Sequence, residues 1–194
     1  MKSHISNRAA VSDPAFIEEV RRIPGGERIL DCIQCGVCAG SCHARFAMDY
    51  SPMQILKMAH LGLKDEVLSS KTIWICASCY TCASRCPRGL NIPAIMSGFK
   101  NMAMKDNAPA PIELKPKFHK TFTEIVSKYG RMHEPELQMK LVKKTSPRAL
   151  LRNASLGIRM LRKGKIRLQP HRLDSSTHFS EICKKSLNGQ EEKK

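Results

Sequence analysis

The stretch CIQCGVCAGSC at residues 32–42 is repeated 44 positions later as CASCYTCASRC at residues 76–86. Both copies have the spacing C-x2-C-x2-C-x3-C, and Pro87 directly follows the second copy. Eight of the nine cysteines in the chain lie in these two stretches, which indicates two similar sites. The eight are Cys32, Cys35, Cys38, Cys42, Cys76, Cys79, Cys82 and Cys86.

This spacing is typical of the cysteines that hold [4Fe-4S] clusters in bacterial ferredoxins. Three closely spaced thiolates can hold three corners of a cube, and the backbone N–H groups between them can point at the sulfurs. The fourth cysteine lies too far along the chain to complete the same cube, so in two-cluster proteins it binds the other cluster. We therefore predict two [4Fe-4S] clusters. The first is held by Cys32, Cys35, Cys38 and Cys86, and the second by Cys76, Cys79, Cys82 and Cys42.

Other uses of cysteine fit the pattern less well. Zinc sites pair their ligands as CxxC…CxxC with a longer gap between the pairs, and a redox-active dithiol needs only two cysteines. Disulfides are disfavoured by the odd number of cysteines and by the polar N-terminus, which lacks the apolar core of a secretion signal. The ninth cysteine, Cys183, stands alone in a polar tail, and we expect a solvated thiol there.

Helix signals surround the repeat, so we predict an all-α fold of the α-helical ferredoxin type. Asp13-Pro14 and Ser51-Pro52 each place a capping residue before a proline, and helices are expected from there to about Arg22 and to a stop at Gly62. A short helix is expected at residues 64–68. A longer one, begun near Asn91 or Pro93, follows from the 3.6-residue period of Ile92, Ile95, Met96, Phe99, Met102 and Ala103.

The proline-containing stretch 106–116 indicates a linker to further helices. One of these is expected to line a single face with Phe118, Phe122, Ile125, Val126 and Tyr129, and Leu137 and Leu141 mark another. A third is expected to start at Ser146-Pro147 and to turn Leu150, Leu151, Ala154, Ile158 and Leu161 inward. We expect poor order from about Gln169 onward.

This organisation predicts four parts. They are an N-terminal helix and turn at 1–27, a two-cluster ferredoxin domain at 28–106, a helical docking extension at 107–168 and a polar tail at 169–194. With 194 residues and no apolar run of the roughly 18 residues that a membrane span needs, we expect a soluble, cytoplasmic protein.

No catalytic constellation accompanies the cysteines. The chain has no GxGxxG stretch, P-loop or nucleophile elbow, and its histidines share no spacing. We therefore expect an electron relay that has no catalytic residue and no substrate site of its own. Trp74, just before the second motif, is expected to shield a cluster from water and so to tune its potential.

Two such motifs separated by a helical insert resemble the all-helical ferredoxin domain in the iron–sulfur subunit of succinate dehydrogenase and fumarate reductase. The resemblance to the C subunit of heterodisulfide reductase (HdrC) is closer. It rests on CIQCGVC at residues 32–38, on IWICASCYTC at residues 73–82 with CPRG at residues 86–89, and on the basic ending RMLRKGK at residues 159–165.

This resemblance implies that the chain relays electrons within a cytoplasmic complex that carries out a step of methanogenesis. The donor would be a flavin-bearing A subunit, and the acceptor a catalytic B subunit that reduces the mixed disulfide of coenzymes M and B. A hydrogenase or formate dehydrogenase would be a further member of the larger complex. The adjacent cysteine pair of the B subunit's signature is absent from this chain, so the reducing site is expected on a partner.

Two other functions stay open at this point. The chain could serve a different oxidoreductase, either a fumarate reductase-like enzyme or a sulfur-metabolism complex. A protein of another class, a basic zinc-binding nucleic-acid protein, would account for the net charge of +16.

Residues 140–172 carry 11 Lys and Arg and no Asp or Glu, and three interpretations apply to this segment. It can be a solvated face, a docking surface for an acidic subunit or a nucleic-acid site. Docking is preferred, because aromatic residues for base stacking are scarce and no nucleic-acid-binding motif is present.

Overall fold

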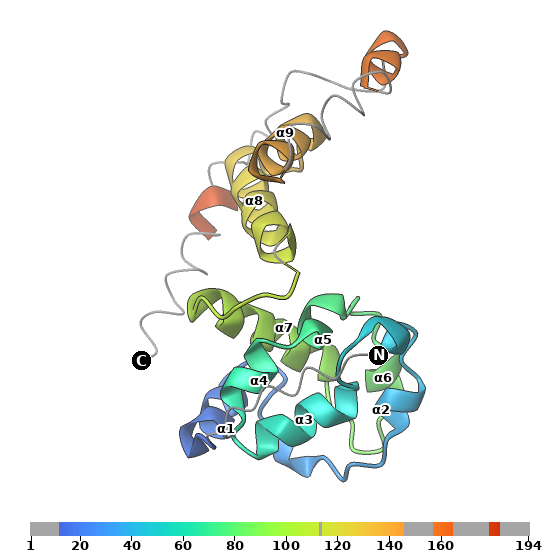
Figure 1. Ribbon diagram of the computed structural model, residues 1–194, viewed down its shortest axis with the longest axis vertical. Coiled ribbons are helices and arrows are strands. Elements are labelled where there is room, and N and C mark those ends of the chain that lie inside the picture. Colours follow the sequence, from blue (N-terminus) through green and yellow to red (C-terminus); the bar gives the residue numbers. More distant parts are fainter. Residues whose placement is uncertain (1–11, 113, 146–156, 165–178, 183–194) are drawn as a thin grey trace. The chain divides into compact units, whose positions relative to one another are not determined.

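A computed structural model describes residues 12–112, 114–145, 157–164 and 179–182 (Figure 1). Every regular element in these segments is helical, which confirms the predicted all-α fold class. The chain forms two compact units, residues 1–112 and residues 113–194. Both cysteine motifs lie in the first unit. The four-part division drawn from the sequence stays a prediction.

The first unit contains seven α-helices and two short 3-10 helices within its described residues. In chain order the elements are α1 (Pro14–Arg21), η1 (Ile29–Asp31), α2 (Val37–Gly40), η2 (Arg45–Ala47), α3 (Pro52–His60), α4 (Lys64–Leu68), α5 (Lys71–Ile75), α6 (Thr81–Ser84) and α7 (Ile92–Lys105).

The predicted capping residues begin the longer helices of this unit. Asp13 accepts a hydrogen bond from the backbone N–H of Ala15 at the start of α1. Ser51 and Gln54 form a reciprocal capping box at the start of α3, and Asn91 caps α7. Each cap satisfies backbone N–H groups that have no partner inside the helix. The predicted helix at 64–68 is confirmed as α4.

The core of the first unit includes residues of α1, α3 and α7, and α1 contacts both of the other helices. Phe16 of α1 stacks on Phe99 of α7 with the ring centroids 6.1 Å apart, and both side chains are fully buried. Ile55 and Leu56 fill the same core from α3. Burying a side chain of this size contributes about 2 kcal/mol, so this core supplies the rigid base for the cysteine loops.

Helices α2 and α6 contact each other at the end of the first unit that lies away from α1 (Figure 1). They are equivalent in the sequence repeat, because α2 spans residues 37–40 and α6 spans residues 81–84. Each four-residue helix contains the third cysteine of its motif, Cys38 or Cys82. The repeat in the sequence is therefore a repeat in the structure.

The second unit contains α8 (Leu114–Tyr129) and α9 (Glu134–Thr145), which pack on each other. The predicted linker at 106–116 is too long, because α8 already begins at Leu114 and holds Pro116 in its first turn, where proline is tolerated. Thr121, Ile125 and Tyr129 are its buried residues, whereas Phe122, predicted for the same face, is exposed.

Part of the helix predicted from Ser146 falls outside the described residues. Its described part is helical at residues 157–162, but Ile158 and Leu161 are exposed there, so the prediction that they turn inward is wrong. The expectation for the polar tail, including Cys183, falls mainly outside the described residues as well. Within the described part of the chain, no helix has the length and apolar character needed to cross a lipid bilayer.

Candidate metal centre

The two cysteine loops repeat the same unusual backbone geometry. Gln34 and its equivalent Ser78 have φ values of 57° and 52°, and Gly36 and its equivalent Tyr80 have φ values of 79° and 59°. Positive φ is sparsely populated by residues other than glycine. The alternation of left-handed and ordinary residues folds each loop tightly between its cysteines, ahead of α2 or α6.

The first group of thiols lines a pocket at one side of the unit. Cys32, Cys35 and Cys38 of the first motif share it with Cys86 of the second motif, and its other walls are mostly apolar. The remaining lining residues are Ile33, Gln34, Gly36, Val37, Met53, Leu56, Pro87, Arg88, Leu90 and Ile92. These four cysteines are the ligand set predicted for the first cluster.

The electrostatics of the buried thiols show which cysteines are neighbours. Burial, followed by the neighbouring thiols of Cys32, Cys82 and Cys35, raises the pKa of Cys38 to about 11. A raised pKa is the expected result when several sulfurs that carry negative charge as thiolates crowd together in a poorly solvated site. Iron would relieve this repulsion, because its positive charge stabilises the thiolates that bind it.

A second group of thiols surrounds Cys82, and the same electrostatic effects identify its members. Burial raises the pKa of Cys82 to about 11, with further raising contributions from Cys76, Cys79 and Cys42. Cys42 belongs to the first motif and the other three to the second. Since Cys38 also interacts with Cys82, the two groups of thiols are adjacent.

The convergence of possible metal-ligating side chains is a further feature of the site. Within the segments that the structure describes, no three His, Cys, Asp or Glu side chains converge closely enough to hold one ion. A tetrahedral zinc site needs such convergence. In a [4Fe-4S] cube each thiolate binds a different iron, so the ligands surround a volume and do not meet at a point.

Several polar groups support the cysteine loops, and the sequence did not single them out. The side-chain amide of Gln34 donates to Cys32 Sγ at 3.3 Å, and Lys100 Nζ donates to the carbonyl oxygen of Cys76 at 3.1 Å. His60 Nε2 lies 2.8 Å from the carbonyl oxygen of Ile29. Lys100 and His60 could not be found from the sequence, because their partners lie 24 and 31 residues away along the chain. The partner of Gln34 is only two residues away, but the contact depends on the left-handed backbone of Gln34.

Exposure differs among the residues of the two loops. The second cysteines of the two motifs, Cys35 and Cys79, are exposed. The side-chain hydrogen bond with Thr81, whose Oγ1 lies 3.5 Å from Cys79 Sγ, is the main cause that lowers the pKa of Cys79. Trp74 is only 2% exposed and forms part of the core, and its shielding of a cluster from water stays a prediction. Its effect on a potential stays a prediction.

Comparison with known proteins identifies the region around the motifs. Residues 28–90 match the 4Fe-4S dicluster domain family, and this range includes all eight clustered cysteines. The chain is 37% identical over 118 residues to the C subunit of the H2:CoB-CoM heterodisulfide,ferredoxin reductase of Methanothermobacter marburgensis, covering 61% of this chain and 60% of the relative.

Two further relatives support the same resemblance. The iron–sulfur C subunit of the CoB–CoM heterodisulfide reductase of Methanopyrus kandleri is 39% identical over 100 residues, 48% of this chain and 52% of the relative. A protein of Archaeoglobus profundus, named as like the heterodisulfide reductase C subunit, is 30% identical over 107 residues, 55% of this chain and 57% of the relative. The chain thus matches little more than half of the length of these proteins. The predicted resemblance to the C subunit of heterodisulfide reductase is confirmed.

Proposed function

We propose that this chain, whose residues 28–90 match the 4Fe-4S dicluster domain family, is the electron-transfer iron–sulfur subunit of a heterodisulfide reductase complex. The observation that carries the proposal is the pair of matching cysteine motifs, which lie within residues 28–90, in a chain that is 37–39% identical to C subunits of methanogens over 100 residues or more. In this role the chain serves an oxidoreductase in the cytoplasm and passes electrons without transforming a substrate itself.

We assign the cysteines in a crossed arrangement, in which the fourth cysteine of each motif binds the cluster of the other motif. One cluster is held by Cys32, Cys35, Cys38 and Cys86. The pocket that these four cysteines line together supports this assignment. The other cluster is held by Cys76, Cys79, Cys82 and Cys42. The electrostatic interaction of Cys82 with the remaining three cysteines supports this assignment. When bound, such clusters carry single electrons at potentials set by burial and by hydrogen bonds to sulfur. The chain contributes the rigid loops, the apolar walls and the Gln34 amide beside Cys32.

The partners follow from this role. A flavin-bearing A subunit donates electrons, and these pass to a catalytic B subunit, which reduces the heterodisulfide of coenzymes M and B. A hydrogenase or formate dehydrogenase belongs to the larger assembly. The name of the Methanothermobacter relative includes hydrogen, the heterodisulfide and ferredoxin, which supports an assembly of this kind.

The basic segment at residues 140–172 docks the chain on an acidic subunit of that complex. Deletion of residues 140–194 is expected to abolish co-purification with the partner subunits. Deletion of residues 169–194 alone is the matched control and should leave most of the association intact. Equal co-purification of both truncated chains would contradict this role for the segment.

A second function in the same class is an electron relay for another oxidoreductase. The Archaeoglobus relative favours it, because its name gives only a likeness to the C subunit and states no substrate. A fumarate reductase-like or sulfur-metabolism complex would use the same cysteine geometry. The subunits that co-purify with the chain distinguish the two functions.

Anaerobic purification of the chain with its partners tests the proposal. We expect a brown protein with about eight irons per chain, as two four-iron clusters require, and reduction of the heterodisulfide only when the catalytic B subunit is present. A colourless protein with two zinc ions would support the zinc-binding alternative and refute the proposal.

A further inference from the structure

The two halves of the sequence repeat differ at the two positions that flank α2 and α6. Gly36 is the N-cap and Ser41 the C-cap of α2. At the equivalent positions Tyr80 is the N-cap and Arg85 the C-cap of α6. The backbone of the repeat is thus retained, while the first half has two small residues where the second half has a large aromatic and a cationic one.

Tyr80 has an unfavourable backbone conformation. Its φ of 59° lies in the left-handed region, which glycine adopts at the same point of the first loop. For a bulky side chain this conformation is costly, and residues held in it are concentrated at functional sites. Glycine would satisfy the loop, so the tyrosine side chain has a role of its own.

Packing does not account for that side chain. Tyr80 is 54% exposed, and among the described residues its phenol oxygen forms no hydrogen bond. It directly follows Cys79, which is also exposed. The aromatic ring therefore stands at the surface beside a cysteine expected to hold a cluster.

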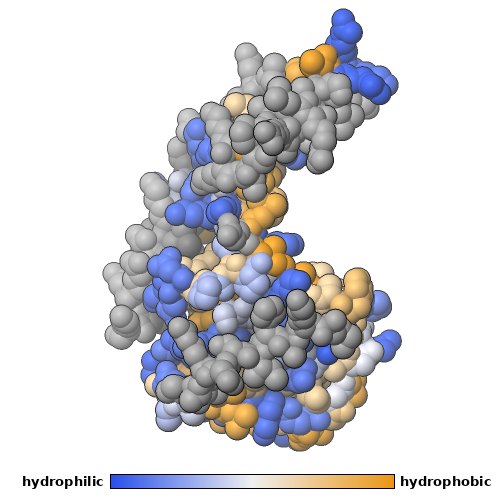
Figure 2. Space-filling view, in the orientation of Figure 1, coloured by the Kyte–Doolittle hydropathy of each residue, from blue (hydrophilic) through white to orange (hydrophobic). Residues whose placement is uncertain are grey.

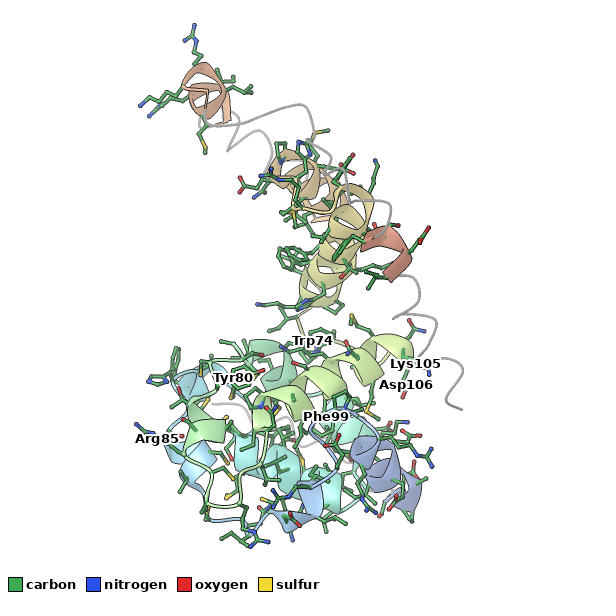
Figure 3. All side chains as sticks on the ribbon, turned by 180° about the vertical axis from the view of Figure 1, so that it is seen from behind. Trp74, Tyr80, Arg85, Phe99, Lys105 and Asp106 are labelled. Atoms are coloured by element: carbon green, nitrogen blue, oxygen red, sulfur yellow. The ribbon has the colours of Figure 1, made fainter. Side chains whose placement is uncertain are left out.

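Arg85 is exposed as well and forms no ion pair with any residue that the structure describes. It ends the four-residue helix α6, which Tyr80 begins. Both side chains lie at the end of the first unit that carries α6 (Figure 3). No carboxylate occurs in this part of the sequence, because residues 67–105 contain five Lys and Arg and no Asp or Glu.

We infer that the edge formed by Tyr80 and Arg85 is a docking surface for a redox protein whose contact surface is rich in carboxylates. The inference rests on the proposed electron-transfer function and specifies where and with what chemistry a partner binds. Tyrosine and arginine are the residue types that most often dominate protein–protein contacts. An exposed arginine that forms no ion pair with the described residues favours an acidic partner.

Small charged electron acceptors test this surface without an identified partner. Hexacyanoferrate(III), an anion, takes one electron from the reduced chain, and hexaammineruthenium(III), a cation, does the same. Arg85→Ser is expected to slow the reaction with the anion by about threefold or more at low ionic strength, and to leave the reaction with the cation equal or faster. Salt should remove the difference.

Ser41→Glu is the matched control, because it changes the net charge by the same one unit at the equivalent position of the first half. We expect it to slow the reaction with hexacyanoferrate(III) less than Arg85→Ser does, because its charge stands beside the first motif and not between the proposed surface and the acceptor. Equal effects of the two substitutions, or no effect of Arg85→Ser, would overturn the inference.

Tyr80→Gly tests the role of the aromatic ring by a readout independent of electron transfer. If the ring serves docking, the variant has an equal or higher melting temperature and unchanged cluster spectra, because the backbone strain is relieved. A lower melting temperature or altered spectra would show that Tyr80 supports the fold or shields a cluster, and would refute its docking role. The wild-type iron content reports separately on the proposed function.

Discussion

Asp49 and Thr72, which lie 23 residues apart, are joined by two hydrogen bonds. Asp49 Oδ1 accepts from the backbone N–H of Thr72 at 2.9 Å and from its hydroxyl at 2.6 Å. Asp49 Oδ2 also accepts from the backbone N–H of Lys71 at 2.7 Å. Asp49 therefore caps α5 from outside the helix and connects the segment after the first motif to the helix that leads into the second.

Replacement of Asp49 by alanine is expected to destabilise the first unit by about 1–3 kcal/mol, because the N–H groups at the start of α5, of which that of Thr72 is partly buried, lose their acceptor. Denaturant unfolding under anaerobic conditions measures this change. Asp65→Ala removes an exposed carboxylate from a neighbouring helix and is the control, with an expected change within about 0.5 kcal/mol. Similar losses for both variants would contradict the capping role.

The same carboxylate predicts an acid-dependent loss of stability. Burial alone would raise the pKa of Asp49, but hydrogen bonds from Thr72, Lys71 and Tyr50 outweigh it and lower that pKa. A lowered pKa in the folded state stabilises the fold above the unfolded value, near 4. The stability difference between the wild type and Asp49→Asn should be full above pH 4 and should shrink as the pH falls through the lower folded value. Unfolding curves at several pH values measure this, and a constant difference would contradict it.

Lys64 connects three separate parts of the first unit. Its Nζ lies 2.8 Å from Glu19 of α1 and 3.1 Å from Asp106, the residue after α7. Because all three side chains are partly exposed, Lys64→Met should cost only about 1 kcal/mol. The cost should fall at high salt, since salt screens exposed ion pairs. Urea unfolding at two salt concentrations checks this, and Lys57→Met, on the exposed side of α3, is the control.

Gly62 ends α3 with a φ of 72°, and a Cβ there would lie 2.5 Å from the backbone oxygen of Asp13. Gly62→Ala should therefore destabilise the unit by more than about 1 kcal/mol, because strain and a backbone clash combine. Gly40→Ala is the control, since a Cβ at Gly40 meets nothing within 4 Å and its φ is not positive. Thermal unfolding compares the two, and equal melting temperatures would refute the expectation.

The crossed ligand sets predict which cysteine variants resemble each other. Cys42→Ser should impair the same cluster as Cys76→Ser, although Cys42 belongs to the other motif, and Cys86→Ser should pair with Cys32→Ser. Each variant is expected to retain about four irons. Electron paramagnetic resonance of the reduced proteins distinguishes the two signals. Matching spectra for Cys42→Ser and Cys32→Ser would exclude the crossed arrangement.

Local signals in the sequence predicted the longer helices of the first unit well. Asp13-Pro14, Ser51-Pro52 and Asn91 act through contacts within one or two turns, so their positions can be read directly from the residues. Helix α5 could not be found in this way. Its N–H groups are satisfied by Asp49, whose distance along the chain hides the cap.

The sequence predicted which residues form the candidate site, but not the backbone conformation of its loops or the surface around them. The cysteine spacing alone suggested all eight ligands and their exchange between motifs. The left-handed conformation of Gln34, Ser78 and Tyr80 was not predicted, because these residue types seldom adopt it. Large apolar side chains at the surface were also not foreseen. Phe46 is 91% exposed, and apolar patches stand among polar ones on the visible surface (Figure 2).

The repeated loops have a consequence for the origin of this domain. In the crossed arrangement of ligands, one copy of the motif supplies three sulfurs to one cube and a single sulfur to the other. A peptide with only one copy could complete both cubes only by pairing with a second identical peptide. Gene duplication and fusion of such a symmetric dimer would produce a chain with this arrangement. In such a chain the two copies could differ in sequence, as Gly36 and Tyr80 do here.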